Sequence, residues 1–438
     1  MAGQNNTLVI GGGWSGLAAA IELSRQHHPV QVLESARQLG GRARRVPFDN
    51  TSLDNGQHLL IGAYRDTLQL LKTIGLDPEQ VLQRFTLDWQ VFSPHHKKIR
   101  IQAYTAPAPL HLLFGLLSAQ GLHWRDKYRA LLLGHKLWKG DSLGEQDISV
   151  QQWLDAHQQS TELVEAFWEP LCLATLNTPL ETASAKTFVR VLSDAFLKSA
   201  AASDYLIPRQ DLSGMFVDPA LTFIEKNGGT IRLAHKVDEI LLQDNHVTGV
   251  RCQDQVIAAE HIILSTPPNI SAGLLAHIPG LEPLVRQLAG FHYHPICTVY
   301  LRYPKDTCLP TTTPVVGMRQ RLCQWVFDRR VCQQAGIIAV VISSSGAHMA
   351  LDNAELIRQV AGELAECFPH WPAHSAAKVI REKRATFACS VGIDTMRPPG
   401  ATAVTGLYLA GDYIDTGYPA TLEGAIQSGL RAARHILQ

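Results

Sequence analysis

The sequence predicts an α/β fold with a nucleotide-binding domain, a mixed-sheet substrate domain and a helical cap. Three observations support this prediction. The chain opens with a strand, a glycine-rich turn, a helix and a second strand that ends in an acidic residue. A matching strand and helix close the chain, and between them lie a helix-rich stretch and several alternating apolar strands. Strands and helices that alternate in this way form parallel sheets with helices packed on them.

The first strand, Thr7 to Ile10, runs directly into the turn sequence GGGWSG. In a G-x-G-x-x-G fingerprint the first glycine allows a tight turn, the second lets phosphate approach the backbone, and the third lets helix pack against strand. The following helix, predicted over Leu17 to Gln26, would aim its N-terminal N–H groups at a pyrophosphate. The residues expected to bind the cofactor here are Gly11, Gly13, Ser15 and Gly16.

The second strand, Val30 to Leu33, ends at Glu34, which is followed by Ser35. A carboxylate at this position accepts both hydroxyls of an adenosine ribose. A second glycine turn follows in the pattern E-x5-G-G-R, which contains Gly41 and Arg42. A second backbone approach and a guanidinium suit an extended dinucleotide, so the sequence favours FAD over NAD.

The end of the chain predicts the flavin-facing part of the same site. A buried-type strand from Gly406 ends in Gly411-Asp412, and a helix begins near Thr421. Asp412 is placed to bind the ribityl chain. The helix start, with Leu422 and Ala425, is placed to direct N–H groups at the flavin ring, where reduction places negative charge. An ordinary strand-turn-helix is the alternative interpretation of this segment taken alone.

The composition is that of an ordinary enzyme. The 438 residues include 39 Lys+Arg and 39 Asp+Glu, so no net charge attracts nucleic acid. The 8 cysteines form no C-x-x-C pair, which favours a reducing compartment. His292 and His294 lie on one strand face without a third ligand at a telling spacing, so we expect no metal. With no signal peptide or transmembrane stretch recognised, we expect a cytoplasmic protein.

These motifs together resemble the flavin-dependent amine oxidase and carotenoid desaturase superfamily. The resemblance implies a discontinuous FAD-binding, Rossmann-like domain of the glutathione-reductase type, assembled from residues 1–70, 205–268 and 400–438. It also identifies NGGTIRLAHKVDEI, in which the backbone of Val237 is expected to contact the adenine. Residues 71–204 are then expected to be a mainly helical substrate or cap region, and residues 269–399 a substrate-domain sheet and helix.

Four further stretches resemble the hydroxysqualene dehydroxylases within this superfamily: DNGQHLLIGAY, EPLCLATLNTPLETASAKTF, IPRQDLSGMFVDPA and DYIDTGYPATLEGAIQSG. The resemblance implies that reduced FAD delivers hydride to hydroxysqualene, giving squalene and water in hopanoid or related triterpenoid synthesis. The donor that reduces the flavin is not identified by the sequence. An isoprenoid desaturase of the phytoene desaturase type is the main alternative, and an amine oxidase or a non-catalytic carrier of prenylated lipids is less favoured.

The proton donor of such a reaction has four candidates, one of which is Asp415. Asp54 and His58 lie in LDNGQH, a loop whose residues Gly56 and Gln57 are also expected beside the flavin. A desolvated carboxyl group there would have a raised pKa and act as an acid, and His58 could do so without a large shift. Tyr418, just before the flavin-facing helix, is the fourth. The alternative is that Asp54 only caps a turn and His58 only hydrogen-bonds backbone.

Residues 108–139 form a predicted basic, amphipathic helical stretch in the middle of the chain. Basic residues interleave with Trp124, Tyr128 and Trp138. Such a helix can lie in the headgroup layer of a membrane, which here would be the inner face of the cytoplasmic membrane. A pair of helices that covers the active site with a solvated basic face explains the same pattern, and the sequence leaves both interpretations open.

Overall fold

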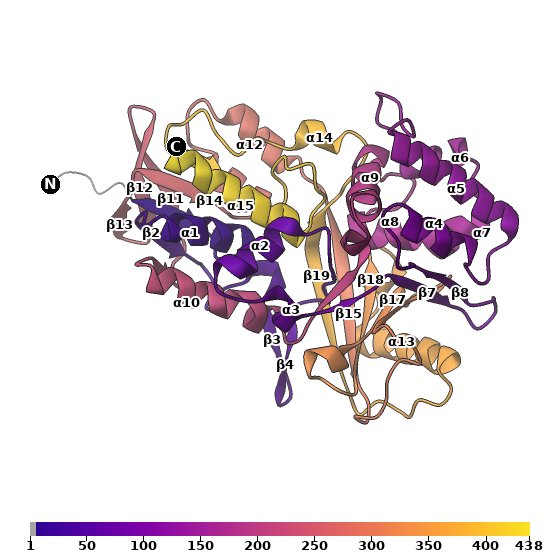
Figure 1. The fold of residues 1–438 in the computed structure, drawn as a ribbon. Helices are drawn as coiled ribbons and strands as arrows, with labels where there is room; N and C mark the ends of the chain where they lie inside the picture. Colours follow the sequence, from indigo (N-terminus) through magenta and orange to yellow (C-terminus); the bar gives the residue numbers. More distant parts are fainter. Residues whose placement is uncertain (1–5) are drawn as a thin grey trace.

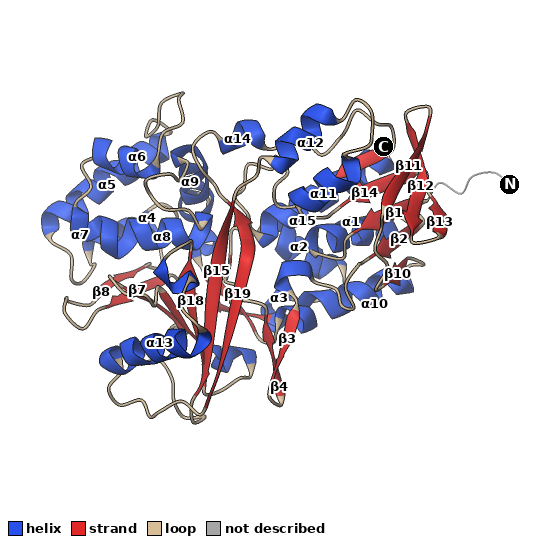
Figure 2. Cartoon of the chain, turned by 180° about the vertical axis from the view of Figure 1, so that it is seen from behind, coloured by secondary structure: helices blue, strands red, loops and turns tan. Residues whose placement is uncertain are grey.

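The computed structural model describes residues 6–438. A nucleotide-binding half, built on a parallel sheet, lies beside a second half in which a large sheet carries a helical cap (Figure 1). The view from behind shows that the long strands of the large sheet lie where the second half adjoins the first (Figure 2).

The parallel sheet has five strands in the order β10-β2-β1-β14-β20, all paired in parallel. The strands are β1 (Thr7–Ile10), β2 (Val30–Leu33), β10 (Thr230–Arg232), β14 (His261–Leu264) and β20 (Leu407–Leu409). They come from three distant parts of the sequence. Their apolar runs are mostly buried, as expected for a parallel sheet covered by other elements.

Helices α1 (Trp14–Arg25) and α15 (Leu422–Leu437) pack side by side against this sheet. Their contact is close, since a Cβ atom built on Gly429 would lie 2.0 Å from the carbonyl oxygen of Ser15. Helix α2 (Arg65–Thr73) adjoins α15, and α10 (Asp218–Lys226) adjoins α1. A three-stranded meander follows β10 and consists of β11 (Glu239–Gln243), β12 (His246–Cys252) and β13 (Gln255–Ala258).

The second sheet has seven strands in the order β19-β15-β18-β17-β16-β7-β8. Its strands are β7 (Asp88–Phe92), β8 (Ile99–Gln102), β15 (Tyr293–Arg302), β16 (Val315–Met318), β17 (Trp325–Asp328), β18 (Ile337–Ser343) and β19 (Ala376–Phe387). Helix α13 (Asn353–Cys367) packs on it, in the region where a sheet and helix were expected. Residues 71–204 were expected to be mainly helical, and within them β7 and β8 also extend this sheet.

The cap consists of α4 (Leu110–Leu117), α5 (Trp124–Lys139), α6 (Val150–Ala156), α7 (Thr161–Leu163), α8 (Glu169–Leu176) and α9 (Ala185–Leu192). The aromatic side chains of Trp153, Trp168 and Phe188 meet edge to face in its core. These three are buried, so they serve packing. No helix within residues 6–438 has the length and apolarity needed to cross a bilayer.

The remaining strands and helices connect these parts. They are β3 (Arg45–Phe48), β4 (Thr51–Asp54), β5 (Leu60–Ile61), α3 (Pro78–Val81), β6 (Leu82–Phe85), β9 (Tyr205–Pro208), α11 (Pro268–Leu275), α12 (Glu282–Ala289) and α14 (Ile393–Met396). The predicted boundaries of β1 and β2 agree with the structure to the residue. The first helix begins at Trp14, three residues earlier than the predicted Leu17, because the glycine turn itself provides its first turn.

Candidate active site

A cavity of about 700 Å³ opens where the parallel strands end. Its lining begins with the residues that follow β1, β2, β14 and β20, namely Gly11, Glu34, Ser265 and Gly411. The carboxyl ends of parallel strands are the usual place for a nucleotide in a sheet of this kind. From there the cavity continues between the large sheet and the cap.

Most residues expected from the sequence line this cavity. They are Gly11, Gly13, Ser15, Glu34, Ser35, Gly41, Arg42, Gly56, Gln57, His58, Val237, Gly411, Asp412, Tyr418, Thr421, Leu422 and Ala425. Gly16 and Asp54 are not among the lining residues. We call the part lined by residues 10–15, 33–44 and 235–237 the nucleotide end.

The three fingerprint glycines occupy different environments. Gly11 has a φ of +108°, a conformation that favours glycine. A Cβ atom on Gly16 would lie 2.0 Å from the carbonyl oxygen of Gly11, so this glycine lets α1 sit against the turn. A Cβ atom on Gly13 would meet no protein atom within 4 Å and would point into open space. Gly13 is therefore the position where a ligand can approach the backbone.

Glu34 is held in position at the end of β2. One carboxylate oxygen accepts the N–H of Gly12 at 2.7 Å, and the other accepts the N–H of Ala36 at 2.7 Å. These bonds fix the carboxylate on the cavity wall, where its remaining lone pairs can accept ribose hydroxyls.

Helix α15 starts at the cavity with a regular N-cap. The hydroxyl of Thr421 accepts the N–H of Gly424 at 3.1 Å, and Thr421, Leu422 and Ala425 line the cavity. The acidic residue in the first turn of α15 does not cap its own helix. The carboxylate of Glu423 caps a different helix, α2, by accepting the N–H groups of Asp66 and Thr67 at 2.9 and 3.0 Å.

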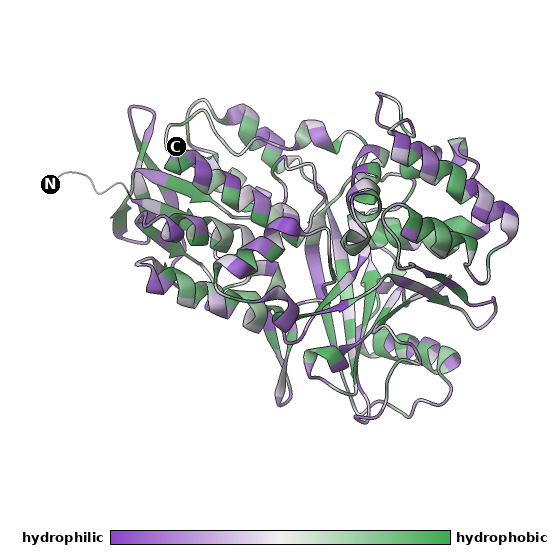
Figure 3. Cartoon of the chain, viewed as in Figure 1, coloured by the Kyte–Doolittle hydropathy of each residue, from purple (hydrophilic) through white to green (hydrophobic). Residues whose placement is uncertain are grey.

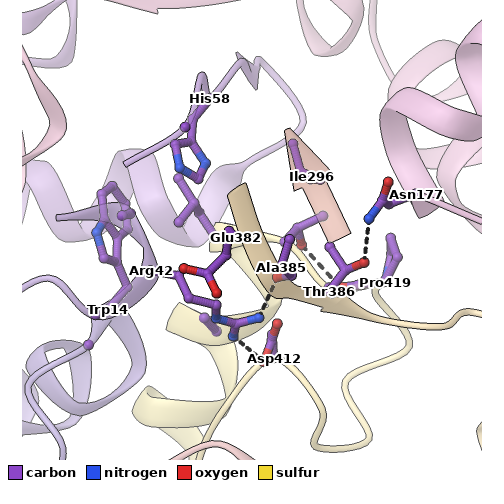
Figure 4. Close-up of a pocket in the computed structure, with 18 of the residues that line it drawn as sticks. Trp14, Arg42, His58, Asn177, Ile296, Glu382, Ala385, Thr386, Asp412 and Pro419 are labelled. Atoms are coloured by element: carbon purple, nitrogen blue, oxygen red, sulfur yellow. Dashed lines mark hydrogen bonds and ion pairs between the residues drawn. The ribbon is translucent and has the colours of Figure 1, made fainter. Parts of the chain in front are cut away.

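Arg42 joins the two glycine motifs from opposite ends of the chain. Its guanidinium forms an ion pair with Asp412 at 2.8 Å and donates to the carbonyl oxygen of Ala385 at 2.6 Å (Figure 4). Both partners line the cavity, as does Glu382, which accepts a hydrogen bond from Asn55 at 3.1 Å. Glu382 was not identified from the sequence, because it lies on an ordinary alternating strand.

The prediction that Asp54 donates a proton is not supported by its geometry. Its carboxylate forms an ion pair at 2.9 Å with Arg329, which is 1% exposed, and accepts the N–H of Leu212 at 2.7 Å. Arg329 also donates to the side chain of Gln57. A carboxylate held by a buried guanidinium outside the cavity lining is suited to positioning the loop of residues 54–58.

His58 lies on the cavity wall, but its imidazole differs from the one expected. Burial lowers its pKa below the ordinary value, and the nearby charge of Asp54 offsets this only in part. The side chain is therefore neutral at pH 7. Its buried Nε2 atom has no hydrogen-bond partner in the protein. A polar atom in this state is suited to a polar ligand.

Tyr418 lies beside a carboxylate that the sequence did not reveal. Asp194 lines the same cavity and is buried, with ion pairs to Arg190 at 3.1 Å and Lys198 at 2.6 Å. Burial and hydrogen bonding to Asp194 raise the pKa of Tyr418. Burial alone would raise the pKa of Asp194, but hydrogen bonds from Lys198, Tyr418 and Arg190 lower it. Tyr418 is thus protonated and Asp194 ionised at pH 7.

The other part of the cavity is lined by large hydrocarbon and aromatic side chains, and we call it the apolar limb. Its side chains come from β7, the cap helices and the large sheet. Trp89 and Trp325 meet edge to face with ring centroids 4.9 Å apart. The apolar limb consists of Leu87, Trp89, Leu171, Leu173, Phe196, Trp325, Phe327 and Val341.

The residues at the nucleotide end, together with His58 and the start of α15, fit FAD. Gly13 leaves open space for a phosphate, Glu34 offers a fixed carboxylate, and the start of α15 offers free N–H groups. The unpartnered Nε2 atom of His58 lies where the cavity leads on from these motifs. Together they match a dinucleotide that lies extended along the cavity, with its reactive ring towards the apolar limb.

Comparison with known proteins agrees with this site. Residues 14–437 match the model of the flavin containing amine oxidoreductase family. A hydroxysqualene dehydroxylase from Rhodopseudomonas palustris is 28% identical over 98% of this chain and 97% of its own. A zeta-carotene desaturase from Solanum lycopersicum is 24% identical over 98% of this chain and 80% of its own.

The fold is also that of a solved oxidoreductase. The crystal structure of an oxidoreductase from Methanosarcina mazei superimposes with a TM-score of 0.76, at 17% identity, over 98% of this chain and 100% of that one. Sequence match, fold and cavity therefore agree. The chain belongs to the flavin containing amine oxidoreductase family, and it is an oxidoreductase whose cofactor is FAD.

Proposed function

We propose that this protein is an FAD-dependent hydroxysqualene dehydroxylase, which replaces the hydroxyl group of an allylic triterpene alcohol with hydrogen. The observation that carries the proposal is the continuity of the cavity from the nucleotide end into the apolar limb. An apolar channel beside a flavin suits a long isoprenoid chain. The three hydroxysqualene dehydroxylases that match at 26–28% identity, each over 98% of this chain, support this substrate.

The reaction joins a proton and a hydride to the alcohol and yields the hydrocarbon and water. Reduced FAD supplies the hydride when it is bound. The C–O bond breaks as the hydroxyl leaves with the proton, and the carbon that remains is an allylic cation until hydride reaches it. The aromatic faces of Trp89 and Trp325 stabilise positive charge, and the hydrocarbon lining keeps out water that would capture the cation.

We assign the proton to Tyr418. Its hydroxyl lines the cavity just before α15, and its raised pKa keeps it protonated at pH 7. A phenol of raised pKa is a weak acid, so the transfer must accompany C–O cleavage. Asp194 lies beside the phenol and pairs with the part-exposed Lys198, which links Tyr418 to solvent for reprotonation.

The test is a single turnover without oxygen. The flavin of the purified protein is photoreduced and hydroxysqualene is added, and we expect flavin reoxidation together with one equivalent of squalene. Tyr418→Phe should slow reoxidation by about 10²-fold or more while FAD stays bound. Tyr413→Phe, a change to a buried tyrosine of the same segment, should leave the rate nearly unchanged.

Isoprenoid desaturation is the second candidate, favoured by the similarity to zeta-carotene desaturases along 98% of the chain. In that reaction hydride moves towards the oxidised flavin. The same preparation separates the two functions. A flavin that stays reduced with hydroxysqualene, but whose oxidised form is bleached by an acyclic polyene precursor, would replace the first proposal with the second.

A further inference from the structure

Exposed hydrophobic side chains are concentrated on one part of the cap. Within residues 6–438, twelve large hydrophobic side chains are exposed, and eight of them lie between residues 104 and 138. Trp124 is 65% exposed and Trp138 58%. We call this group the cap surface: Tyr104, Leu110, Phe114, Leu117, Trp124, Tyr128, Leu132 and Trp138. Isolated exposed hydrophobic residues are common, but a contiguous group of this kind marks an interaction site.

The cap surface follows helical periodicity on both helices. On α5, Trp124, Tyr128 and Leu132 recur every four residues, which places them on one face. On α4, Leu110, Phe114 and Leu117 are four and three residues apart, so they also share one face. The two helices pack together, and Lys127 of α5 donates to the carbonyl oxygen of Leu117 at 2.9 Å. Green hydrophobic and purple hydrophilic segments alternate along these helices in Figure 3.

Within residues 104–139, the exposed Lys, Arg, Asp and Glu side chains are all basic. Five basic residues lie on α5: Arg125, Lys127, Arg129, Lys136 and Lys139. The only acidic residue between positions 104 and 139 is Asp126, and its side chain is buried. The protein as a whole has equal numbers of acidic and basic residues, so this local excess is distinctive.

The cap surface also lies directly behind the cavity. Helix α5 contacts the turn Ser193–Leu197, whose residues Asp194 and Phe196 line the cavity. On α4 the buried His111 lies 3.3 Å from the hydroxyl of Ser203, another lining residue. One layer of cap residues thus separates the exposed hydrophobic helices from the cavity.

We propose that the cap surface docks on a lipid bilayer that carries anionic headgroups. Tryptophan and tyrosine are the residues that occupy the interface between headgroups and acyl chains, and lysine and arginine around them attract anionic lipid. A second copy of this chain is a poorer occupant, because two basic rims would face one another. Delivery of a lipid substrate by this route rests on the proposed function, whereas docking itself does not.

Vesicle binding tests the proposal without any assay of activity. The holoprotein is sedimented with vesicles of phosphatidylcholine alone and with vesicles that also contain phosphatidylglycerol. We expect binding to the anionic vesicles that weakens as salt is raised. Removing two charges in Lys136→Gln/Lys139→Gln should weaken it about fivefold per charge. Trp124→Ser/Trp138→Ser should weaken it further.

The matched control is Val256→Ser, which removes an exposed hydrophobic side chain (54% exposed) from β13, outside the cap. It should bind vesicles as the unchanged protein does. Flavin absorbance and circular dichroism establish that each variant is folded. Failure to bind anionic vesicles, equal binding to both vesicle types, or an equal loss in the control would overturn the proposal.

Sedimentation velocity addresses the remaining occupant. We expect a species whose mass does not depend on concentration over the range used for vesicle binding. A dimer that Trp124→Ser/Trp138→Ser converts to monomer would assign the cap surface to a second copy instead. Because neither measurement uses hydroxysqualene, a failure of docking is distinguishable from a failure of the proposed reaction.

Discussion

At the nucleotide end of the cavity the lining consists mainly of backbone turns that follow parallel strands, whereas the apolar limb is lined by side chains from separate strands and cap helices. The first construction depends on a few glycines and one carboxylate, and most of its parts lie within residues 10–44. The second depends on how the large sheet and the cap meet. The backbone therefore determines what the nucleotide end can bind. In the apolar limb, substitution of side chains can change which ligand fits.

The link between the two regions is the buried pair of Arg329 and Asp54, and breaking it should have the largest effect. Arg329→Met leaves the Asp54 carboxylate buried without its partner, which should cost about 3–5 kcal/mol in the free energy of unfolding. Urea denaturation measures this. Arg330→Met, at the exposed neighbouring position, should cost about 0.5 kcal/mol or less. Adding Asp54→Asn to Arg329→Met should restore part of the loss, and a double variant no more stable than the single one would contradict this account.

Two glycine substitutions sharpen the contrast within the nucleotide end. Gly16→Ala places a methyl group against the carbonyl of Gly11, so we expect a loss of about 1–3 kcal/mol in stability even without FAD. Gly13→Ala meets no protein atom, so the apoprotein should be as stable as before. It should bind FAD about tenfold more weakly or worse, since the methyl group takes the space of the phosphate. Thermal unfolding of the apoproteins and FAD titration distinguish the two. Unchanged FAD affinity in Gly13→Ala would remove phosphate from this position.

A substitution in the apolar limb should have the opposite pattern. Leu173→Gln introduces an amide into the hydrocarbon lining, which should lower kcat/KM for a lipid substrate by about tenfold or more, or ~1–3 kcal/mol. FAD affinity should not change, because Leu173 lies on the cap helix α8 and not at the nucleotide end. Leu173→Met, which keeps the volume and the apolar character, is the control. Equal FAD loss in both variants would mean that the two regions are not independent.

The pH dependence of stability gives the smallest effect. The pKa of His58 is lowered by burial in the folded protein, so below the ordinary pKa of histidine the unfolded chain binds more protons than the folded one. Stability should therefore be constant near pH 7 and above, and fall as the pH drops below about 6.5. His58→Gln should reduce this slope by up to about 1.4 kcal/mol per pH unit. Denaturant titrations between pH 5 and 8 measure it, and an unchanged slope would mean that His58 is as accessible to protons as in the unfolded chain.

The same contrast explains what could be predicted from the sequence. The strands that hold Gly11 and Glu34 were located to the residue, because the motif that binds the cofactor also sets the local fold. Asp194 and Glu382 could not be found in this way. Each lies in an unremarkable helix or strand and reaches the cavity only through packing between distant segments. The ion pair of Asp54 could not be predicted for a related reason, since its partner Arg329 is far away in sequence and gives no local signal.

The contacts of β20 and α15 also affect how the protein folds during synthesis. Strand β20 completes the edge of the parallel sheet, α15 packs against α1, and Glu423 caps the start of α2. Two of these contacts serve helices α1 and α2, within the first 73 residues, which leave the ribosome long before residues 407–437, whereas β20 pairs with β14. The nascent N-terminal segment must therefore wait, with its apolar helix faces uncovered, until residues 407–437 have been made. Truncation of the final helix should consequently leave a chain that aggregates rather than a smaller protein that retains its cofactor.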